Sequence, residues 1–141
     1  MIPYEVIEHT ADIGLRIYGG DLPELFTHAA EGLFDLITDA EKIRAGKKPA
    51  RFSFRLKAEN EGDLLLAWLR EMLFTFGAQK LVLMDFQFTR LTGKELEASA
   101  AAYPFDPAWD EQKYEVKAVT YHHFKIEKTK NGWLAEVIFD I

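Results

Sequence analysis

Apolar side chains in this chain recur with two periods, one typical of helices and the other typical of strands. Over residues 22–37 they are spaced by three and four positions, which places them on one face of a helix. Asp21 and Glu24 form a capping pair at the start of this predicted helix. The apolar stripe consists of Leu22, Leu25, Phe26, Ala29, Ala30, Leu33, Phe34 and Ile37.

A second helix is predicted over residues 63–76. Its apolar side chains stand on nearly all sides, from Leu64 at one end to Phe76 at the other. A helix without a continuous polar face is typical of a protein interior. We therefore expect this helix to be deeply buried.

The rest of the pattern has a period of two, which is typical of strands with one wet face. Thr92-Gly93 and Asn131-Gly132 are turn signals that join strands as hairpins. The predicted strands cover residues 13–17, 52–56, 82–88, 96–102, 119–127 and 133–140. Hairpin-linked strands with two substantial helices predict an α+β fold, a single domain over residues 1–141 with a mixed, largely antiparallel sheet and two main helices packed on it. Residues 38–49 and 103–113 are predicted to be loops, and the first of them holds basic residues.

Composition narrows the classes of function. The chain has 141 residues, of which 48% are hydrophobic, enough for the core of one domain. Seventeen Lys and Arg against 23 Asp and Glu give a net charge of −6, which disfavours tight binding of nucleic acid through phosphate neutralisation. The absence of cysteine excludes disulfides, thiolate metal sites and cysteine nucleophiles.

The first residues lack the basic and apolar regions of a signal peptide, and no stretch of 18 uninterrupted apolar residues follows. The sequence therefore predicts a soluble cytoplasmic protein without a membrane partner.

Residues 8–12, Glu8-His9-Thr10-Ala11-Asp12, lie between two strand patterns. The simpler interpretation of Thr10 and Asp12 is a structural turn, in which short polar side chains bond the backbone. The alternative is a carboxylate held at a strand edge, because Asp12 falls on the face of Gly14 and Arg16, away from the apolar set. That face is open to a ligand.

The chain stops at Phe139-Asp140-Ile141, directly after an apolar strand. If this strand is central and ordered, the terminal carboxylate lies one residue from the Asp140 carboxylate. Two such groups are costly together unless a cation, Lys or Arg lies between them, and hard cations such as calcium or magnesium bind oxygen sites of this kind. The alternative is a frayed, solvated end. Asp12 matters only if the fold brings it near.

Histidines and basic residues offer weaker signals. His122 and His123 are neighbours in a predicted strand, so we expect their rings on opposite faces and no shared zinc site. Residues 42–51 hold five basic side chains, including Lys47 and Lys48. A solvated loop is the usual explanation of such a run, and RNA phosphates or an acidic partner are the alternative. Lys117, before the penultimate strand, is placed to offset a nearby carboxylate cluster.

Four blocks, in this order, resemble the archease family. They are residues 8–15 (EHTADIGL), 63–69 (DLLLAWL), 116–122 (VKAVTYH) and 135–141 (AEVIFDI). The resemblance covers essentially the whole chain, including its end at Asp140-Ile141. It implies a fold related to small strand-helix-strand-strand modules.

The resemblance also implies a function. Archeases assist the GTP-dependent RNA ligase of the RtcB type in tRNA splicing and RNA repair, by promoting its guanylylation and repeated turnover. They are also associated with modulation of tRNA methyltransferases. The family's metal site, usually described for calcium, matches Asp12, Asp140 and the terminal carboxylate of Ile141 in this chain, and Lys117 and His9 are candidates that tune the site or contact the partner.

Three hypotheses follow. The first is a non-catalytic, metal-binding activator of an RNA ligase. The second is a stand-alone metal-dependent phosphoester hydrolase, in which the cation activates water and Glu8 or His9 is the general base. The third is a modulator or chaperone of a tRNA methyltransferase, acting through the surface around Lys47 and Lys48.

Overall fold

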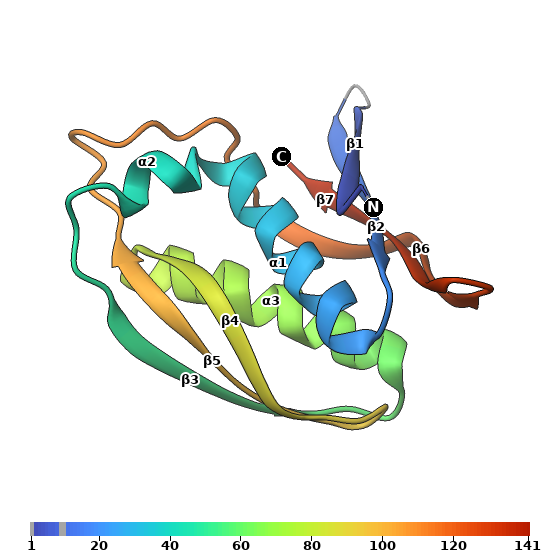
Figure 1. The fold of residues 1–141 in the computed structure, drawn as a ribbon. Helices are drawn as coiled ribbons and strands as arrows, with labels where there is room; N and C mark the ends of the chain where they lie inside the picture. Colours follow the sequence, from blue (N-terminus) through green and yellow to red (C-terminus); the bar gives the residue numbers. More distant parts are fainter. Residues whose placement is uncertain (1, 9–10) are drawn as a thin grey trace.

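A computed structural model describes residues 2–8 and 11–141 (Figure 1). In chain order the elements are β1 (Tyr4–Glu8), β2 (Asp12–Gly19), α1 (Leu22–Ile37), α2 (Ala40–Arg44), β3 (Ala50–Lys57), α3 (Glu61–Gln79), β4 (Leu81–Leu91), β5 (Glu95–Pro104), β6 (Ala118–Thr129) and β7 (Gly132–Asp140). The α+β class, the antiparallel strands and the two main helices are confirmed.

The strands of the described residues form two sheets and not the single sheet that we expected. One has the order β1-β2-β7-β6 and the other β3-β5-β4, and every pairing is antiparallel. Helices α1 and α3 lie between the sheets and contact both of them (Figure 1). Helix α3 is apolar on nearly all sides, so packing against a single sheet would leave part of its apolar surface exposed to water. One sheet on each side of the helix layer covers this surface.

Helix α1 has the bounds that its apolar stripe predicts. The Asp21 carboxylate accepts a hydrogen bond from the Glu24 N–H at 2.9 Å, and the Glu24 carboxylate accepts one from the Gly20 N–H at 2.9 Å. The first bond satisfies a donor that a helix start otherwise leaves open, and the second ties Glu24 to the residue before the cap. The short helix α2 lies in the stretch that we expected to be a loop, since five residues are too few to show a period.

Trp68 of α3 is the centre of the aromatic core. It is fully buried, and its indole Nε1–H donates to the carbonyl oxygen of Phe26 in α1 at 3.0 Å. Phe54 and Phe86, from the three-stranded sheet, meet its ring edge to face with centroids 5.5 and 5.6 Å away. Helix α3 is thus fixed to both α1 and the smaller sheet.

Strand β7 is central, as the sequence predicts, and pairs with β2 on one side and β6 on the other. Ala135, Val137 and Phe139 on one of its faces are fully buried. The C-terminus consequently ends beside the β1–β2 hairpin, which is formed by the first strands of the chain (Figure 1). None of the helices in the described residues is both long and apolar enough to cross a membrane.

Gly132, in the predicted Asn-Gly turn, offers a test of this packing. Its φ is +144°, and an added Cβ would overlap the carbonyl oxygen of Gly19 at the end of β2. We expect Gly132→Ala to lower the free energy of unfolding by about 1–3 kcal/mol in thermal or urea denaturation. Gly77→Ala is the control, because nothing lies within 4 Å of a Cβ there, and we expect a gain of about 0.5–1 kcal/mol from better helix propensity. Equal effects of the two substitutions would contradict this account.

Candidate functional site

Two carboxylates face each other across neighbouring strands. Asp12 begins β2, Asp140 ends β7, and the two residues are partners in the antiparallel register. Residues directly opposite in such a pair project to the same face, with Cβ atoms about 4.5–5.5 Å apart. The fold therefore joins the early acidic residue to the last one, which the sequence alone left open.

Among the described residues, one oxygen of this pair has no hydrogen-bond partner. Asp12 Oδ1 is buried and makes no hydrogen bond with the described residues. A buried carboxylate oxygen without a donor is costly, and an ion is one of the standard explanations for it. Among the described residues no hydrogen bond uses the Asp12 side chain, and Thr10, the other residue of the turn that we considered, lies outside them, so the turn interpretation stays a prediction.

The end of the chain is held in place up to Asp140. The Asp140 carbonyl oxygen accepts a hydrogen bond from the Lys117 N–H at 2.8 Å, and Asp140 is also in register with Ala118 of β6. Ile141 is half-buried and packs against the core. The frayed end that we considered is therefore not seen among the described residues, because the chain is paired up to Asp140 and Ile141 packs on the core.

In another row of cross-strand residues in the same sheet, a basic side chain pairs with the acids. Arg16 lies between Glu5 and Glu136 across β1, β2 and β7. Its guanidinium donates from Nε to Glu136 at 2.8 Å and lies 3.4 Å from Glu5, and the Glu136 hydrogen bond and charge raise the pKa of Arg16. Among the described residues, the row of Asp12 and Asp140 holds two acids and no basic side chain.

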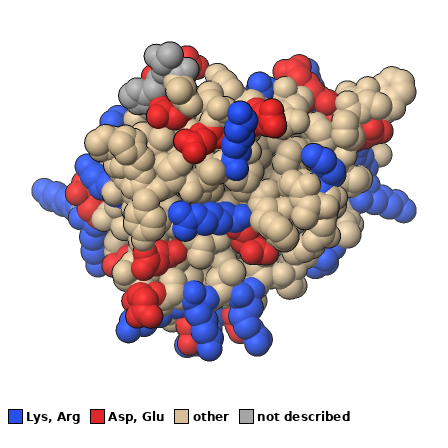
Figure 2. All heavy atoms as spheres, turned by 180° about the vertical axis from the view of Figure 1, so that it is seen from behind, with Lys and Arg blue, Asp and Glu red and all other residues tan. Residues whose placement is uncertain are grey.

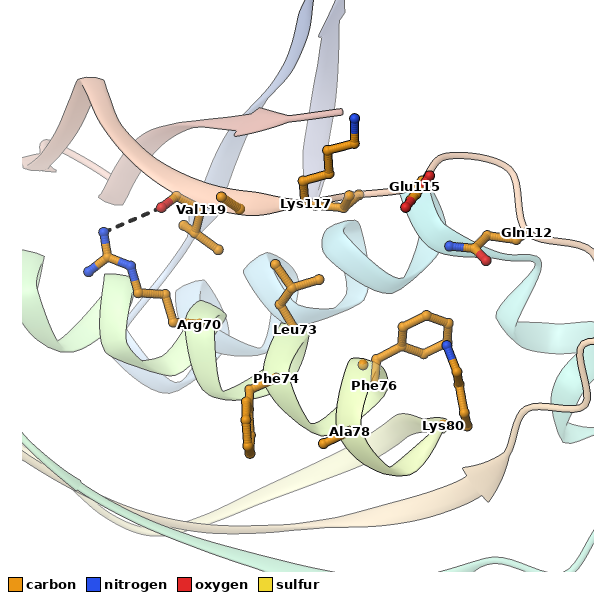
Figure 3. A pocket seen from close by; sticks show the side chains of 13 residues that line it. Arg70, Leu73, Phe74, Phe76, Ala78, Lys80, Gln112, Glu115, Lys117 and Val119 are labelled. Atoms are coloured by element: carbon orange, nitrogen blue, oxygen red, sulfur yellow. Dashed lines mark hydrogen bonds between the residues drawn. The ribbon is translucent and has the colours of Figure 1, made fainter.

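Lys117 does not supply the missing charge. Its ammonium is exposed and, within the described chain, forms no ion pair within 4.0 Å of a carboxylate. Figure 3 shows its side chain extending away from α3. His9 lies outside the described residues, and Glu8 accepts a hydrogen bond from the Tyr114 hydroxyl at 3.4 Å.

The donor set fits a hard divalent cation. Its members are the side chains of Asp12 and Asp140 and the terminal carboxylate of Ile141, all oxygen groups of the kind that calcium and magnesium bind. Within the described part of the chain, no three His, Cys, Asp or Glu side chains gather as a metal cluster. The third group of this set is a main-chain carboxylate, so a pattern of side chains alone does not reveal it.

The histidine pair differs from our expectation. The rings of His122 and His123 are 4.1 Å apart between centroids, so they do not lie on opposite faces. The cause is an irregularity in β6, whose register with β7 shifts between Thr120 and Lys125 and where His123 has a φ of +52°. A bulge of this kind breaks the alternation that places strand neighbours on opposite faces.

The basic run in residues 42–51 is largely engaged with the chain itself. Lys47 Nζ lies 2.7 Å from Asp110 Oδ2 and donates to the carbonyl oxygen of Pro104 at 2.8 Å. Arg44 forms a two-pronged pair with Asp85 at 2.8 and 3.2 Å. These contacts tie loop 38–49 to loop 103–113 and to β4, which favours a structural role over an RNA-binding patch.

Comparison with known proteins gives one family. The model of the Archease protein family (MTH1598/TM1083) matches residues 4–141. Protein archease of Pyrococcus furiosus is 39% identical over the whole of both chains, and that of Methanosarcina mazei is 34% identical over 98% of this chain and 95% of its own.

Two solved structures share the fold. The solution structure of protein 1598 of Methanobacterium thermoautotrophicum has a TM-score of 0.78 and 28% identity over all of both chains. The crystal structure of an archease, described as a possible chaperone, from Thermotoga maritima has a TM-score of 0.67 and 22% identity, over 96% of this chain and 94% of its own.

The like-charged pair predicts a gain in stability when one charge is removed. With a chelator present, we expect Asp12→Asn to raise the free energy of unfolding by about 0.2–1 kcal/mol, because like charges opposite each other in a sheet destabilise it. Thermal denaturation measures the change. Glu59→Gln, in the exposed loop before α3, removes the same charge away from the pair and is the control. A variant at Asp12 that is less stable than this control would show that the pair is not repulsive.

The pair of Lys47 and Asp110 predicts a pH dependence. The hydrogen bond from Lys47 is the largest cause that lowers the pKa of Asp110, and the bond from the Asp106 N–H is the second. The charged pair therefore stabilises the folded state fully above the ordinary aspartate pKa of about 3.9. This stabilisation is lost as the pH falls through the lower pKa of the folded state. We expect Lys47→Met to lower the Tm by up to about 3 °C at pH 7. The difference from the unsubstituted protein should shrink below about pH 4. Lys48→Met is the control, and a constant difference from pH 7 to pH 2 would refute the assignment.

Proposed function

Because the chain belongs to the archease family, we propose that it is a non-catalytic accessory protein of an RtcB-type, GTP-dependent RNA ligase. In this proposal it promotes guanylylation of the ligase and thereby its repeated turnover in tRNA splicing and RNA repair in the cytoplasm. The description of the Thermotoga maritima archease as a possible chaperone is compatible with a helper of another protein. What this chain contributes is a cation at the end of β7.

The observation that carries this proposal is the row of Asp12 and Asp140, with a buried oxygen that has no hydrogen-bond partner among the described residues. The two side chains and the Ile141 carboxylate would hold a divalent cation, for which calcium is our first choice. Calcium takes six to eight oxygen ligands, so three carboxylates leave positions to water or to oxygens of the partner. When bound, the cation supplies positive charge that stabilises phosphate oxygens in the nucleotide site of the ligase.

A protein partner is favoured over RNA. The net charge is −6, and the side chains of Arg44 and Lys47, within the basic run, are already paired with acids of the chain. Lys117 stands beside Asp140 with an exposed ammonium, and we assign it to contact with the partner. His9 is proposed, from its place in the sequence next to Asp12, to tune the same site.

The metal site is tested without the ligase. Addition of CaCl₂ at 100 times the Kd should raise the free energy of unfolding by about 2.7 kcal/mol, read as a higher Tm, and isothermal calorimetry should show one site. Asp12→Asn and Asp140→Asn should abolish both effects, and Glu59→Gln should keep them. Calcium binding that survives both substitutions would refute the site.

The function is tested by multiple-turnover ligation. Substoichiometric cognate ligase with GTP and RNA ends should turn over repeatedly only with this protein present, and the stimulation should be lost with Asp12→Asn or Asp140→Asn. Glu59→Gln should stimulate as the unsubstituted protein does. No stimulation by the unsubstituted protein would end the proposal.

The same preparations separate the two alternatives. Chelator-sensitive hydrolysis of a model phosphoester by this protein alone would favour the hydrolase. A change in tRNA methyltransferase specificity that is lost with Lys47→Glu and Lys48→Glu, and kept with Asp12→Asn, would favour the modulator.

A further inference from the structure

A groove of about 740 Å³ runs between the C-terminal half of α3 and residues 112–119 (Figure 3). Its volume is within the range of protein sites that hold ligands. The groove borders the candidate cation site, because Lys117 lines it and also bonds Asp140 through the main chain. A molecule lying in the groove would therefore reach the end of β7.

The floor of the groove is apolar. Phe76, Val116 and Val119 are nearly buried, and Leu73 points from α3 toward the opposite segment (Figure 3). Phe74 lines the groove with 65% of its surface exposed. An exposed phenylalanine beside an apolar floor is typical of a protein interaction site.

Positive charge surrounds this floor in a protein of net charge −6. Arg70, Lys80 and Lys117 line the groove, against Glu115 as its single acid. Seen from the side opposite to the view of Figure 1, the centre of the surface is largely uncharged, with individual basic and acidic side chains set into it (Figure 2).

Two of the cations are held in position. Arg70 donates to the carbonyl oxygen of Val119 at 3.3 Å and lies over the Tyr121 ring. Lys80 Nζ is 5.1 Å from the centroid of the Phe76 ring. Side chains that are ordered before binding lose less entropy when a partner arrives.

From this combination we propose that the groove docks a peptide segment of the ligase in which an apolar side chain is flanked by carboxylates. The apolar residue lies on Leu73 and Phe76, and the carboxylates meet Arg70, Lys80 and Lys117. The assignment rests on the proposed function for the identity of the partner. The three cations call for carboxylates in the segment, by charge complementarity. A nucleic acid is a poorer occupant, because its backbone would place charged phosphates against the apolar floor.

Docking predicts a kinetic signature in the ligation assay that differs from loss of the cation. Phe74→Ser and Lys80→Glu should each raise the concentration of this protein needed for half-maximal stimulation about tenfold, because hot-spot residues contribute this much, and leave the maximal rate unchanged. Trp109→Ser, at a site 87% exposed outside the groove, and Lys130→Glu, in the β6–β7 turn, are the matched controls and should change neither value.

The outcomes separate this inference from the proposed function. If Asp12→Asn abolishes stimulation while Phe74→Ser and Lys80→Glu act like their controls, the groove assignment is wrong and the proposed function stands. If the unsubstituted protein gives no stimulation, both are overturned.

A second measurement tests the chemistry of the occupant. Overlapping synthetic peptides that cover the ligase sequence are used to compete with the ligase for this protein. The competing peptides should combine Leu, Ile, Met or Phe with two or more Asp or Glu, and they should fail to bind Phe74→Ser. Competition only by basic peptides, displacement by an RNA oligonucleotide or GTP, or self-association that Phe74→Ser abolishes would overturn the assignment.

Discussion

The central place of β7 between β2 and β6 is the constraint on which the candidate site depends. Pairing on both sides holds the last strand up to Asp140, where the Lys117 N–H closes the ladder. Ile141, which follows directly, is half-buried and packs against the core. The antiparallel register then adds Asp12, from the other end of the chain.

The outer face of this sheet contains two rows of acidic side chains, which differ in whether a basic side chain pairs with them. In one row, Arg16 bridges Glu5 and Glu136. In the other, Asp12 and Asp140 face each other, and among the described residues no basic side chain lies between them. This contrast between the two rows of described residues is the observation from which we propose that a cation binds at the second row.

The position of α3 explains the groove in the same terms. Most of its apolar surface is covered by the two sheets and by α1, with Trp68 at the centre. Near its C-terminal end this cover is incomplete, so Leu73 is half-buried and Phe74 is exposed. An apolar helix surface that its own chain does not cover, bordered by Arg70 and Lys80, is suited to an acidic and apolar segment of another protein.

Several features depend on local spacing and could therefore be predicted from the order of residues. The stripe from Leu22 to Ile37, its cap at Asp21 and the turn at Asn131-Gly132 were predictable because neighbouring residues decide them. Alternation also placed Asp12 on the wet face of its strand.

Contacts between distant residues became visible with the folded chain. The register of β2 with β7 brings Asp12 opposite Asp140, a bulge in β6 puts the rings of His122 and His123 on one side, and Lys47 bonds Asp110 across two loops. The division into two sheets belongs to the same class. These features depend on strand order and register, which follow from packing the whole core and leave no trace in the local period of the chain.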